Sequence, residues 1–277
     1  MEIRILCFDL DGTFLRDDKS IPPENLRALE RAAARGVQLV PATGRIYRGI
    51  PEALRTPPCM RWFITANGAY LYDAAEDRAA ARAEIPAAQA AAFFEYVDTL
   101  GVLYDCYKDN WGYMTASMLE EAVRVIPDPG VRRLITGLRT PVPELKRYLA
   151  EQGGGVQKLQ LYFTDMDARA RQLRELPARF PDLSFSTSMP FNIEINARTS
   201  TKGQALLTLC ALLDIPPAQA MALGDGTNDL DMIRNAGLGV AMGNAAPELL
   251  AAADHVTGSN NEAGFAAAVE RFVLRGS

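Results

Sequence analysis

Short runs of apolar residues recur along the chain, and each ends at a polar residue or a glycine. The runs are ILCF before Asp9, VQLVPA before Thr43–Gly44, WFITA before Asn67–Gly68, AMALG before Asp225, and GLGVAM before Gly243–Asn244. Continuous apolar runs bounded by turn residues are typical of strands buried on both faces, as in a parallel sheet. The pattern therefore predicts a parallel sheet to which these runs contribute strands.

Helical patterns separate several of the predicted strands. Residues 23–35 place Leu26, Leu29 and Ala33 on one face, begin after Pro22 and end at Gly36. Residues 202–213, residues 228–235 and the segment PELLAAA show comparable patterns. Alternation of strand and helix predicts right-handed crossovers and a Rossmann-like α/β fold. The polar strand ends would then lie at the carboxyl edge of the sheet, where such folds bind ligands.

The middle of the chain has a different pattern. The aromatic-rich residues 104–116 predict a strand or hairpin, AAQAAAFFEYVDTLG and ARARQLRELPARF predict amphipathic helices, and VQKLQLYF predicts a strand. We interpret residues 83–190 as an inserted α+β cap domain. Residues 1–82 and 191–277 would form the core domain, because FNIEI near residue 191 is interpreted as the point where the first sheet resumes.

Composition excludes several classes of protein. The 277 residues are 48% hydrophobic and 23% charged, with a net charge of −5, which argues against a nucleic-acid partner. No apolar run reaches the roughly 18 residues of a membrane span, and no secretion signal is recognisable. The four cysteines lie far apart without a CxxC pair. These features predict a cytoplasmic protein with no membrane partner; the oligomeric state stays open and is compatible with a monomer.

Two aspartates, Asp9 and Asp11, follow the first buried run directly. If the predicted sheet is correct, Asp225 lies within several ångströms of them. Two unit charges 4 Å apart repel by about 4 kcal/mol at an effective dielectric constant of 20. A divalent cation would remove this repulsion, and an all-oxygen ligand set with few protein ligands favours Mg²⁺. We therefore predict Mg²⁺ as the cofactor.

Spacing suggests a role for each polar group. Asp9 is held rigidly by its strand and can attack phosphorus as a nucleophile, and Asp11 is placed to exchange a proton with the leaving group and with water. Thr43 offers a hydroxyl and Gly44 its backbone N–H to a phosphoryl oxygen. Lys202 opens a helix, where its ammonium group and the helix N-terminus both favour an anion.

Other interpretations of these fragments stay open. Asn228 and Asp229 could hold the phosphate, the waters of the metal or Lys202. An isolated Asp-x-Asp is usually a solvated turn, Asp9 could be a helix cap, and Arg45 could form a surface ion pair. The four fragments in this order, each at a strand end or a helix start, favour the catalytic interpretation.

The sequence resembles the haloacid dehalogenase-like superfamily in DLDGT, TGR, the Lys202–Gly203 helix start and GDGTND. The segments ITANGA and NIEINARTSTKGQAL are similar to its Cof-type, class IIB phosphatases, which have a large α/β cap. The resemblance implies that Asp9 is the nucleophile, Asp11 the acid/base, and Thr43 and Lys202 the phosphate binders. It also implies Mg²⁺ ligation by Asp9, Asp11 (including its backbone carbonyl) and Asp225. We add Asp229 to the expected metal residues, and expect substrate contacts from Leu10, Gly44, Arg45, Asn67, Lys202 and Asn228.

These expectations combine into a Mg²⁺-dependent phosphatase that hydrolyses small phosphorylated metabolites through an aspartyl-phosphate. Sugar phosphates are the substrates that the family likeness suggests. A phosphomutase would use the same nucleophile but would form an isomerised product. A phospho-accepting signalling module also uses clustered aspartates, but it lacks the second aspartate two residues after the acceptor.

Overall fold

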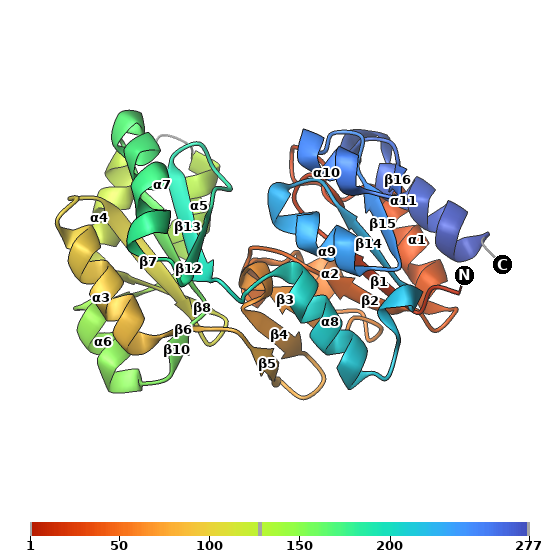
Figure 1. The fold of residues 1–277 in the computed structure, drawn as a ribbon, viewed down its shortest axis with the longest axis horizontal. Coiled ribbons are helices and arrows are strands. Elements are labelled where there is room, and N and C mark those ends of the chain that lie inside the picture. The colour runs from red at the N-terminus through yellow and green to blue at the C-terminus, as the bar shows by residue number, and fades with distance from the viewer. Residues whose placement is uncertain (1, 127–128, 276–277) are drawn as a thin grey trace. The chain divides into compact units, whose positions relative to one another are not determined.

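The apolar runs build a parallel β-sheet in the computed structural model, which describes residues 2–126 and 129–275 (Figure 1). The strand order is β16–β15–β14–β1–β2, and each neighbouring pair is parallel. The strands are β1 (Ile5–Phe8), β2 (Gln38–Pro41), β14 (Ala220–Gly224), β15 (Leu238–Ala241) and β16 (His255–Val256). Every residue of β1 and β14 is buried, as continuous apolar runs require. The predicted α/β class with a parallel-sheet core is confirmed.

Helices cover both faces of this sheet. One face packs against α8 (Lys202–Leu212), α9 (Leu230–Asn235) and α10 (Pro247–Ala252) through a shared apolar core. On the other face α1 (Pro23–Ala33) contacts α11 (Gly264–Val269), and the rings of Phe8, Phe14 and Phe265 touch one another with centroids 4.9–5.2 Å apart. Fully burying one such ring contributes about 1.5–3 kcal/mol. Both faces of the sheet are therefore covered by apolar packing, which leaves its edge as the place for a binding site.

The third predicted strand departs from the expected parallel arrangement. β3 (Trp62–Thr65) belongs to a separate three-stranded sheet with β4 (Tyr70–Asp73) and β5 (Arg78–Arg82), and it pairs antiparallel with β4. The reason lies in the loop between β3 and β4, where Ala66 and Asn67 have φ values of 50° and 60° and turn the chain back immediately. A parallel bridge from Ala42 to Ile64 still holds the end of β3 beside β2.

The chain divides into two compact units, and the second consists of residues Arg45–Ile50 and Arg82–Ser200. Its six-stranded sheet has the order β12–β13–β11–β7–β8–β9, antiparallel except for the parallel pair β8–β9. The strands are β7 (Leu103–Lys108), β8 (Trp111–Thr115), β9 (Arg139–Val142), β11 (Lys158–Tyr162), β12 (Leu183–Ser186) and β13 (Asn192–Ala197). The hairpin predicted at 104–116 corresponds to β7 and β8. A small pair, β6 (Ile85–Pro86) with β10 (Gly155–Val156), completes the strands of this unit.

Apolar side chains of the six-stranded sheet point to one face and pack against three helices. These are α3 (Ala87–Asp98), α6 (Leu145–Gln152) and α7 (Met166–Arg179). Part of the opposite face packs against α4 (Ala116–Val125) and α5 (Pro129–Gly137). The remaining helix, α2 (Glu52–Arg55), belongs to the first unit.

The observed boundary between the two units corrects the sequence interpretation. We expected residues 191–277 to return to the first sheet, but β13 pairs antiparallel with β11 and β12, and Ile193 and Ile195 are buried in the core of the second unit. The alternation of apolar and polar residues in FNIEI is typical of an antiparallel strand with one apolar face. The first unit consists of Met1–Gly44, Pro51–Ala81 and Thr201–Ser277.

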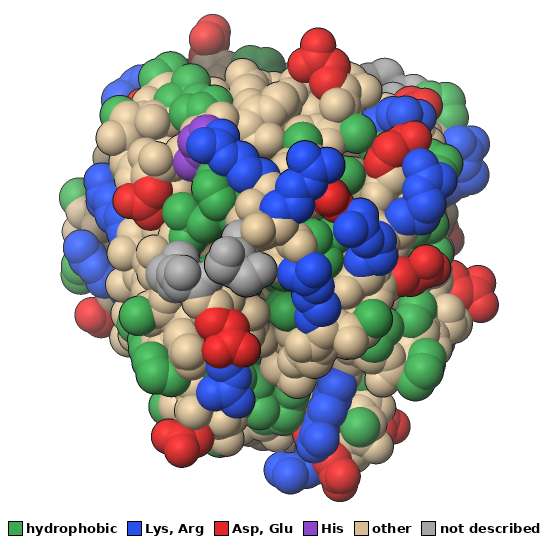
Figure 2. Space-filling view, turned by 90° about the vertical axis from the view of Figure 1, so that its right-hand side faces the viewer, with side chains coloured by type: hydrophobic (Ala, Val, Ile, Leu, Met, Phe, Trp, Pro, Cys, Tyr) green, Lys and Arg blue, Asp and Glu red, His purple; other side chains and the backbone are tan. Residues whose placement is uncertain are grey.

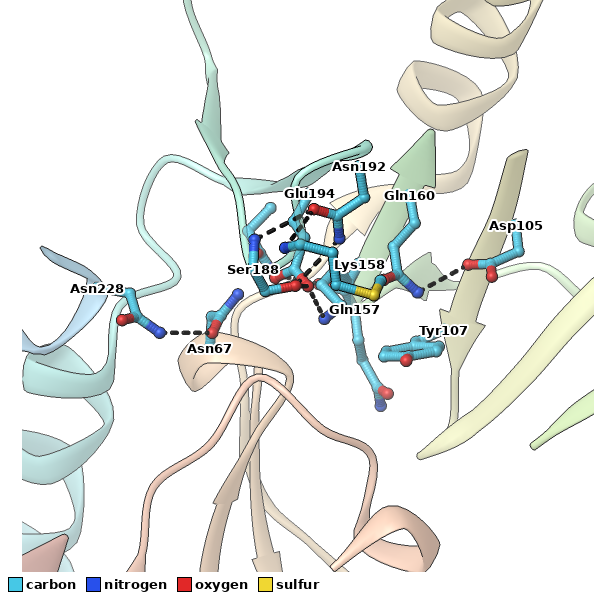
Figure 3. A network of polar contacts seen from close by, with 12 residues as sticks. Asn67, Asp105, Tyr107, Gln157, Lys158, Gln160, Ser188, Asn192, Glu194 and Asn228 are labelled. Atoms are coloured by element: carbon cyan, nitrogen blue, oxygen red, sulfur yellow. Dashed lines mark hydrogen bonds and ion pairs between the residues drawn. The ribbon is translucent and has the colours of Figure 1, made fainter. Parts of the chain in front are cut away.

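The polar face of the second sheet carries buried charges that are fully hydrogen-bonded. Asp105 accepts hydrogen bonds from Arg139 Nε at 2.6 Å and from the hydroxyl of Tyr162 at 2.7 Å. It also accepts one from Gln160 Nε2 at 2.9 Å (Figure 3). Burial lowers the pKa of Arg139, but the Asp105 carboxylate outweighs this effect and raises the pKa above its ordinary value. The buried guanidinium of Arg139 is thus compensated by a carboxylate that contacts it directly.

Basic and acidic side chains are interspersed on the face of the first unit that Figure 2 shows. On the same unit Glu270 lies between Arg31 and Arg275, at 2.5 Å and 3.0 Å. Within the described part of the chain, no helix has both the length and the apolar character that crossing a membrane requires.

Candidate functional site

Asp9 and Asp225 lie at the ends of neighbouring strands. Phe8 of β1 pairs with Leu223 of β14, so the residues that follow each strand leave the sheet side by side. The backbone N–H of Asp9 donates to the carbonyl of Leu223 at 3.0 Å, which fixes the first carboxylate against the second strand. The structure thus brings together the aspartates that the sequence placed at one edge.

Lys202 lies at the centre of the carboxylates. Its Nζ is 2.5 Å from Oδ1 of Asp9 and 2.5 Å from Oδ1 of Asp229, and its side chain has no exposed surface. Carboxylate oxygens of Asp9, Asp225 and Asp229 all lie within 4.8 Å of one another. The site is therefore a cluster of three carboxylates, two of which contact one buried ammonium group.

The electrostatics of the site reflect this crowding. Burial raises the pKa of Asp9 well above its ordinary value, Lys202 opposes the rise, and the neighbouring aspartates add to it. Burial, followed by the Asp229 carboxylate, raises the pKa of Asp225 to about 6. Burial alone would lower the pKa of Lys202, but Asp229 and Asp9 outweigh it and raise that pKa. Lys202 therefore stays protonated, but its single positive charge faces more than one carboxylate.

Asp229 acts on its surroundings through both carboxylate oxygens. Oδ1 contacts Lys202, while Oδ2 accepts the backbone N–H groups of Asp225 and Gly226, each at 3.0 Å. The carboxylate thus holds the lysine and the loop after β14 together. Of the sequence alternatives for Asp229, contact with Lys202 is observed.

The loop after β14 packs tightly against the loop after β1. Thr13 donates its hydroxyl to Oδ1 of Asp225 at 2.8 Å, and Gly12 has φ of +83°. A Cβ at Gly12 would collide with the Asp225 carboxylate. Only glycine combines this backbone conformation with such a close approach. The sequence alone assigns no role to Thr13. Its position next to Gly12 in the DLDGT motif is the signal that could have indicated its contact with Asp225.

Asp11 and Leu10 lie differently from the other predicted residues. Asp11 is outside the group of three acids, and its Oδ1 forms a partly exposed ion pair with Lys19 at 2.9 Å. The side chain of Leu10 is fully buried, and its carbonyl accepts the N–H groups of Phe14 and Leu15. Substrate contact by Leu10 is therefore restricted to its backbone.

Thr43, Gly44, Asn67 and Asn228 form the second part of the site. Thr43 is buried, and its backbone exchanges hydrogen bonds with Ile64 and Asn67. A Cβ at Gly44 would lie 2.8 Å from Oδ1 of Asn67, and that same oxygen accepts Nδ2 of Asn228 at 3.3 Å (Figure 3). These four residues come from three distant segments of the chain and lie close together.

Arg45 belongs to the second unit, where its Nη1 donates to the carbonyl of Gly49 at 2.8 Å. Next to it Arg48 stacks on the ring of Trp111 at 4.0 Å, and the N–H of Tyr47 donates to Asn110. The contact of Arg45 with the Gly49 carbonyl lies within the second unit, and its contact with substrate stays a prediction.

The donor set fits a magnesium ion. All the nearby ligand atoms are carboxylate oxygens, which hard cations such as Mg²⁺ prefer. Burial, together with the neighbouring carboxylates, raises the pKa of Asp9 and of Asp225 although Lys202 opposes the rise. A divalent cation at these oxygens would supply the missing charge.

A parallel sheet with carboxylates, a lysine and a threonine at its carboxyl edge is typical of proteins that accept or transfer phosphoryl groups. The family model for haloacid dehalogenase-like hydrolases matches residues 6–269, and the chain belongs to this family.

Known relatives agree with this assignment. The chain is 28% identical to the 5-amino-6-(5-phospho-D-ribitylamino)uracil phosphatase YcsE of Bacillus subtilis, over 99% of this chain and 97% of the relative. It is 31% identical to the putative phosphatase YxeH of the same organism, over 98% of each. The structure of the subclass IIB sugar phosphatase BT4131 has the same fold, with a TM-score of 0.78, 24% identity and coverage of 97% and 98%. The protein is therefore a phosphatase of the haloacid dehalogenase-like family.

Proposed function

We propose that the protein is a Mg²⁺-dependent phosphomonoesterase that acts on small phosphorylated metabolites, sugar phosphates in particular, through an aspartyl-phosphate on Asp9. The single observation that carries this proposal is the buried Lys202 between Asp9 and Asp229, with Asp225 beside them. This arrangement holds the nucleophile in one orientation, and its carboxylates would bind the cation that neutralises a phosphoryl group.

In the first step the free carboxylate oxygen of Asp9 attacks phosphorus, and the bond from phosphorus to the ester oxygen breaks. Asp11 donates its proton to the departing oxygen, so that an alcohol leaves. The Asp11–Lys19 contact does not prevent this role, because an ion pair between partly exposed side chains is worth at most about 1 kcal/mol.

In the second step water attacks the phosphorus of the aspartyl-phosphate. Asp11, now a carboxylate, takes the proton from that water, the bond from phosphorus to Asp9 breaks, and inorganic phosphate leaves. Thr43 and the N–H of Gly44 would bind phosphoryl oxygens, and Lys202 would balance their charge. Asp9, Asp225 and the backbone carbonyl of Asp11 would hold Mg²⁺, which supplies charge neutralisation at the phosphoryl oxygens.

We propose further that the second unit acts as the cap that sets substrate specificity, and that the enzyme works in the cytoplasm on a soluble metabolite. The family likeness supports the first point, and the free, widely spaced cysteines support the second.

Phosphate release from a panel of sugar, nucleotide and cofactor phosphates, with and without a chelator, tests the proposal. We expect metal-dependent release from at least one small phosphate ester by the wild type and none by Asp9→Asn. Isomerised product in place of free phosphate would identify a phosphomutase, and an aspartyl-phosphate that persists for hours would identify a signalling module.

A further inference from the structure

The segment that follows β15 contacts both loops of the carboxylate site. The N–H of Met242 donates to the carbonyl of Gly224 at 3.0 Å, and the N–H of Ala246 donates to the carbonyl of Asp225 at 2.8 Å. Between them, Nδ2 of Asn244 donates to the carbonyl of Gly12 at 2.8 Å. One short stretch of chain thus holds the loop after β14 with its backbone and the loop after β1 with a side chain.

The Gly12 carbonyl belongs to the loop that carries both Asp11 and Thr13. Gly12 separates Asp11 from Thr13, and Thr13 donates its hydroxyl to Asp225 at 2.8 Å. Because no Cβ fits between Gly12 and the Asp225 carboxylate, the two loops lie in direct contact. Rotation of this peptide would shift the Asp11 backbone and the Thr13 hydroxyl together.

Asn244 is itself held in one orientation. Its Oδ1 accepts the backbone N–H of Asn260 at 3.0 Å, while its Nδ2 faces the Gly12 carbonyl. Exchanging the two amide atoms would set donor against donor and acceptor against acceptor, so the assignment is unambiguous. Asn260 is buried and donates to the carbonyl of Leu15 and to Asp17, each at 3.0 Å.

Only a side chain with a donor and an acceptor on one planar group can make both contacts of Asn244. An aspartate has the same shape and keeps the acceptor for Asn260, but it faces the Gly12 carbonyl with an oxygen. The asparagine is therefore chemically specified, although it lies at an exposed position.

We propose that Asn244 is a positioning residue of the cation site: it holds the Gly12 peptide against the Asp225 loop and thereby sets the distance between the two ligand-bearing loops. The proposal rests on the proposed function to the extent that Mg²⁺ is the ion bound there. It adds a residue from a third strand end to the residues that the family motifs supply.

The test compares Asn244→Asp with the wild type and with Asn261→Ala. The control residue, Asn261, also contacts the loop after β1, through Asp17, but it does so at a point away from Gly12. Mg²⁺ binding is measured by titration calorimetry on the free protein, together with the melting temperature in chelator and the kinetics of phosphate release.

We expect Asn244→Asp to bind Mg²⁺ about tenfold more weakly, the scale on which groups that support metal ligands act. The added negative charge by itself would tighten cation binding, so a loss cannot be an effect of charge. We expect a melting temperature in chelator close to that of the wild type, a lower kcat and a nearly unchanged KM. Asn261→Ala should bind Mg²⁺ like the wild type.

Equal Mg²⁺ affinity in Asn244→Asp and the wild type would overturn the inference, as would an equal loss in Asn261→Ala. A wild type that does not bind Mg²⁺ would overturn it together with the metal site. A wild type that binds Mg²⁺ but releases no phosphate would refute the proposed function alone, because calorimetry still decides the role of Asn244.

Discussion

Lys202 shows why the residues of this site depend on one another. A fully buried ammonium group is costly unless its charge is compensated, and here two carboxylates contact it at 2.5 Å. The same contacts keep Asp9 from being an unpaired buried charge, while burial still raises its pKa. Keeping the buried Asp9 carboxylate ionised costs free energy, and a bound cation would lower that cost.

Asp9→Asn isolates the role of the nucleophile. We expect phosphate release to fall by roughly 10³-fold or more, because an amide cannot form the acyl phosphate. Stability in chelator should be equal or higher, since the substitution removes a buried negative charge and Lys202 keeps Asp229. Steady-state kinetics and thermal unfolding measure both effects; wild-type turnover in this variant would refute covalent catalysis at Asp9.

Asp73 gives a pH dependence that can be tested apart from the site. Its carboxylate accepts two hydrogen bonds from Arg61, at 2.9 Å and 2.7 Å, and these lower its pKa although burial opposes the shift. The stabilisation is therefore complete above the unfolded-state pKa, near 4, and is lost as the pH falls through the lower folded-state pKa.

We expect Asp73→Asn to lower the free energy of unfolding by about 1 kcal/mol at pH 7, because the Arg61 side chain is 46% exposed and solvent screens the pair. The difference from the wild type should vanish at about pH 3. Urea unfolding at the two pH values measures it, and a difference independent of pH would show that the charge of Asp73 contributes nothing.

At the scale of elements, the loop between β3 and β4 positions the start of α8. Gly68 has φ of +96°, and a Cβ there would collide with the carbonyl of Thr201. Thr201 caps α8 by accepting the N–H of Gln204, and Lys202 is the next residue. Residues Ala66–Gly68 of this loop therefore pack directly against the start of α8, which carries Lys202.

Gly68→Ala should destabilise the protein by about 2–4 kcal/mol, because it combines backbone strain with a steric collision. The matched control is Gly36→Ala: Gly36 has φ of +78°, but nothing lies within 4 Å of the added Cβ. Gly36→Ala should lower the free energy of unfolding by about 1–2 kcal/mol, because only the strain of the left-handed backbone conformation is added. Chemical denaturation measures both variants, and equal losses would contradict the close packing at Thr201.

At the scale of the whole molecule, the first unit joins segments from both ends of the chain into one sheet edge. β1 and β14 are neighbours, although more than 200 residues separate them in sequence, and an entire second unit lies between them. A cation bound by carboxylates from both strands would therefore link the first and last parts of this unit, so metal binding should stabilise its fold.

Addition of Mg²⁺ to chelator-treated protein should raise the melting temperature, with a stabilisation of about 1.4 kcal/mol at ten times the dissociation constant. Asp225→Asn should lose most of this increase, and chelator should abolish phosphate release. Differential scanning calorimetry across a Mg²⁺ series measures the shift. An enzyme that is fully active in chelator would contradict the cation requirement.

The sequence alone determined the elements and their polar ends. Short apolar runs bounded by turn residues favour strands buried on both faces, so β1, β2, β14 and β15, and with them Asp9 and Asp225, could be placed without coordinates. The family resemblance added roles for these residues, which the proposed experiments test.

Tertiary structure alone decided pairing and contact. The partner of β13 depends on long-range packing that a short alternating run does not specify, so residues 191–200 were assigned to the wrong unit. In the same way no local pattern shows that Asn244 contacts Gly12, because hydrogen bonds between distant loops exist only once the sheet has brought its strand ends together.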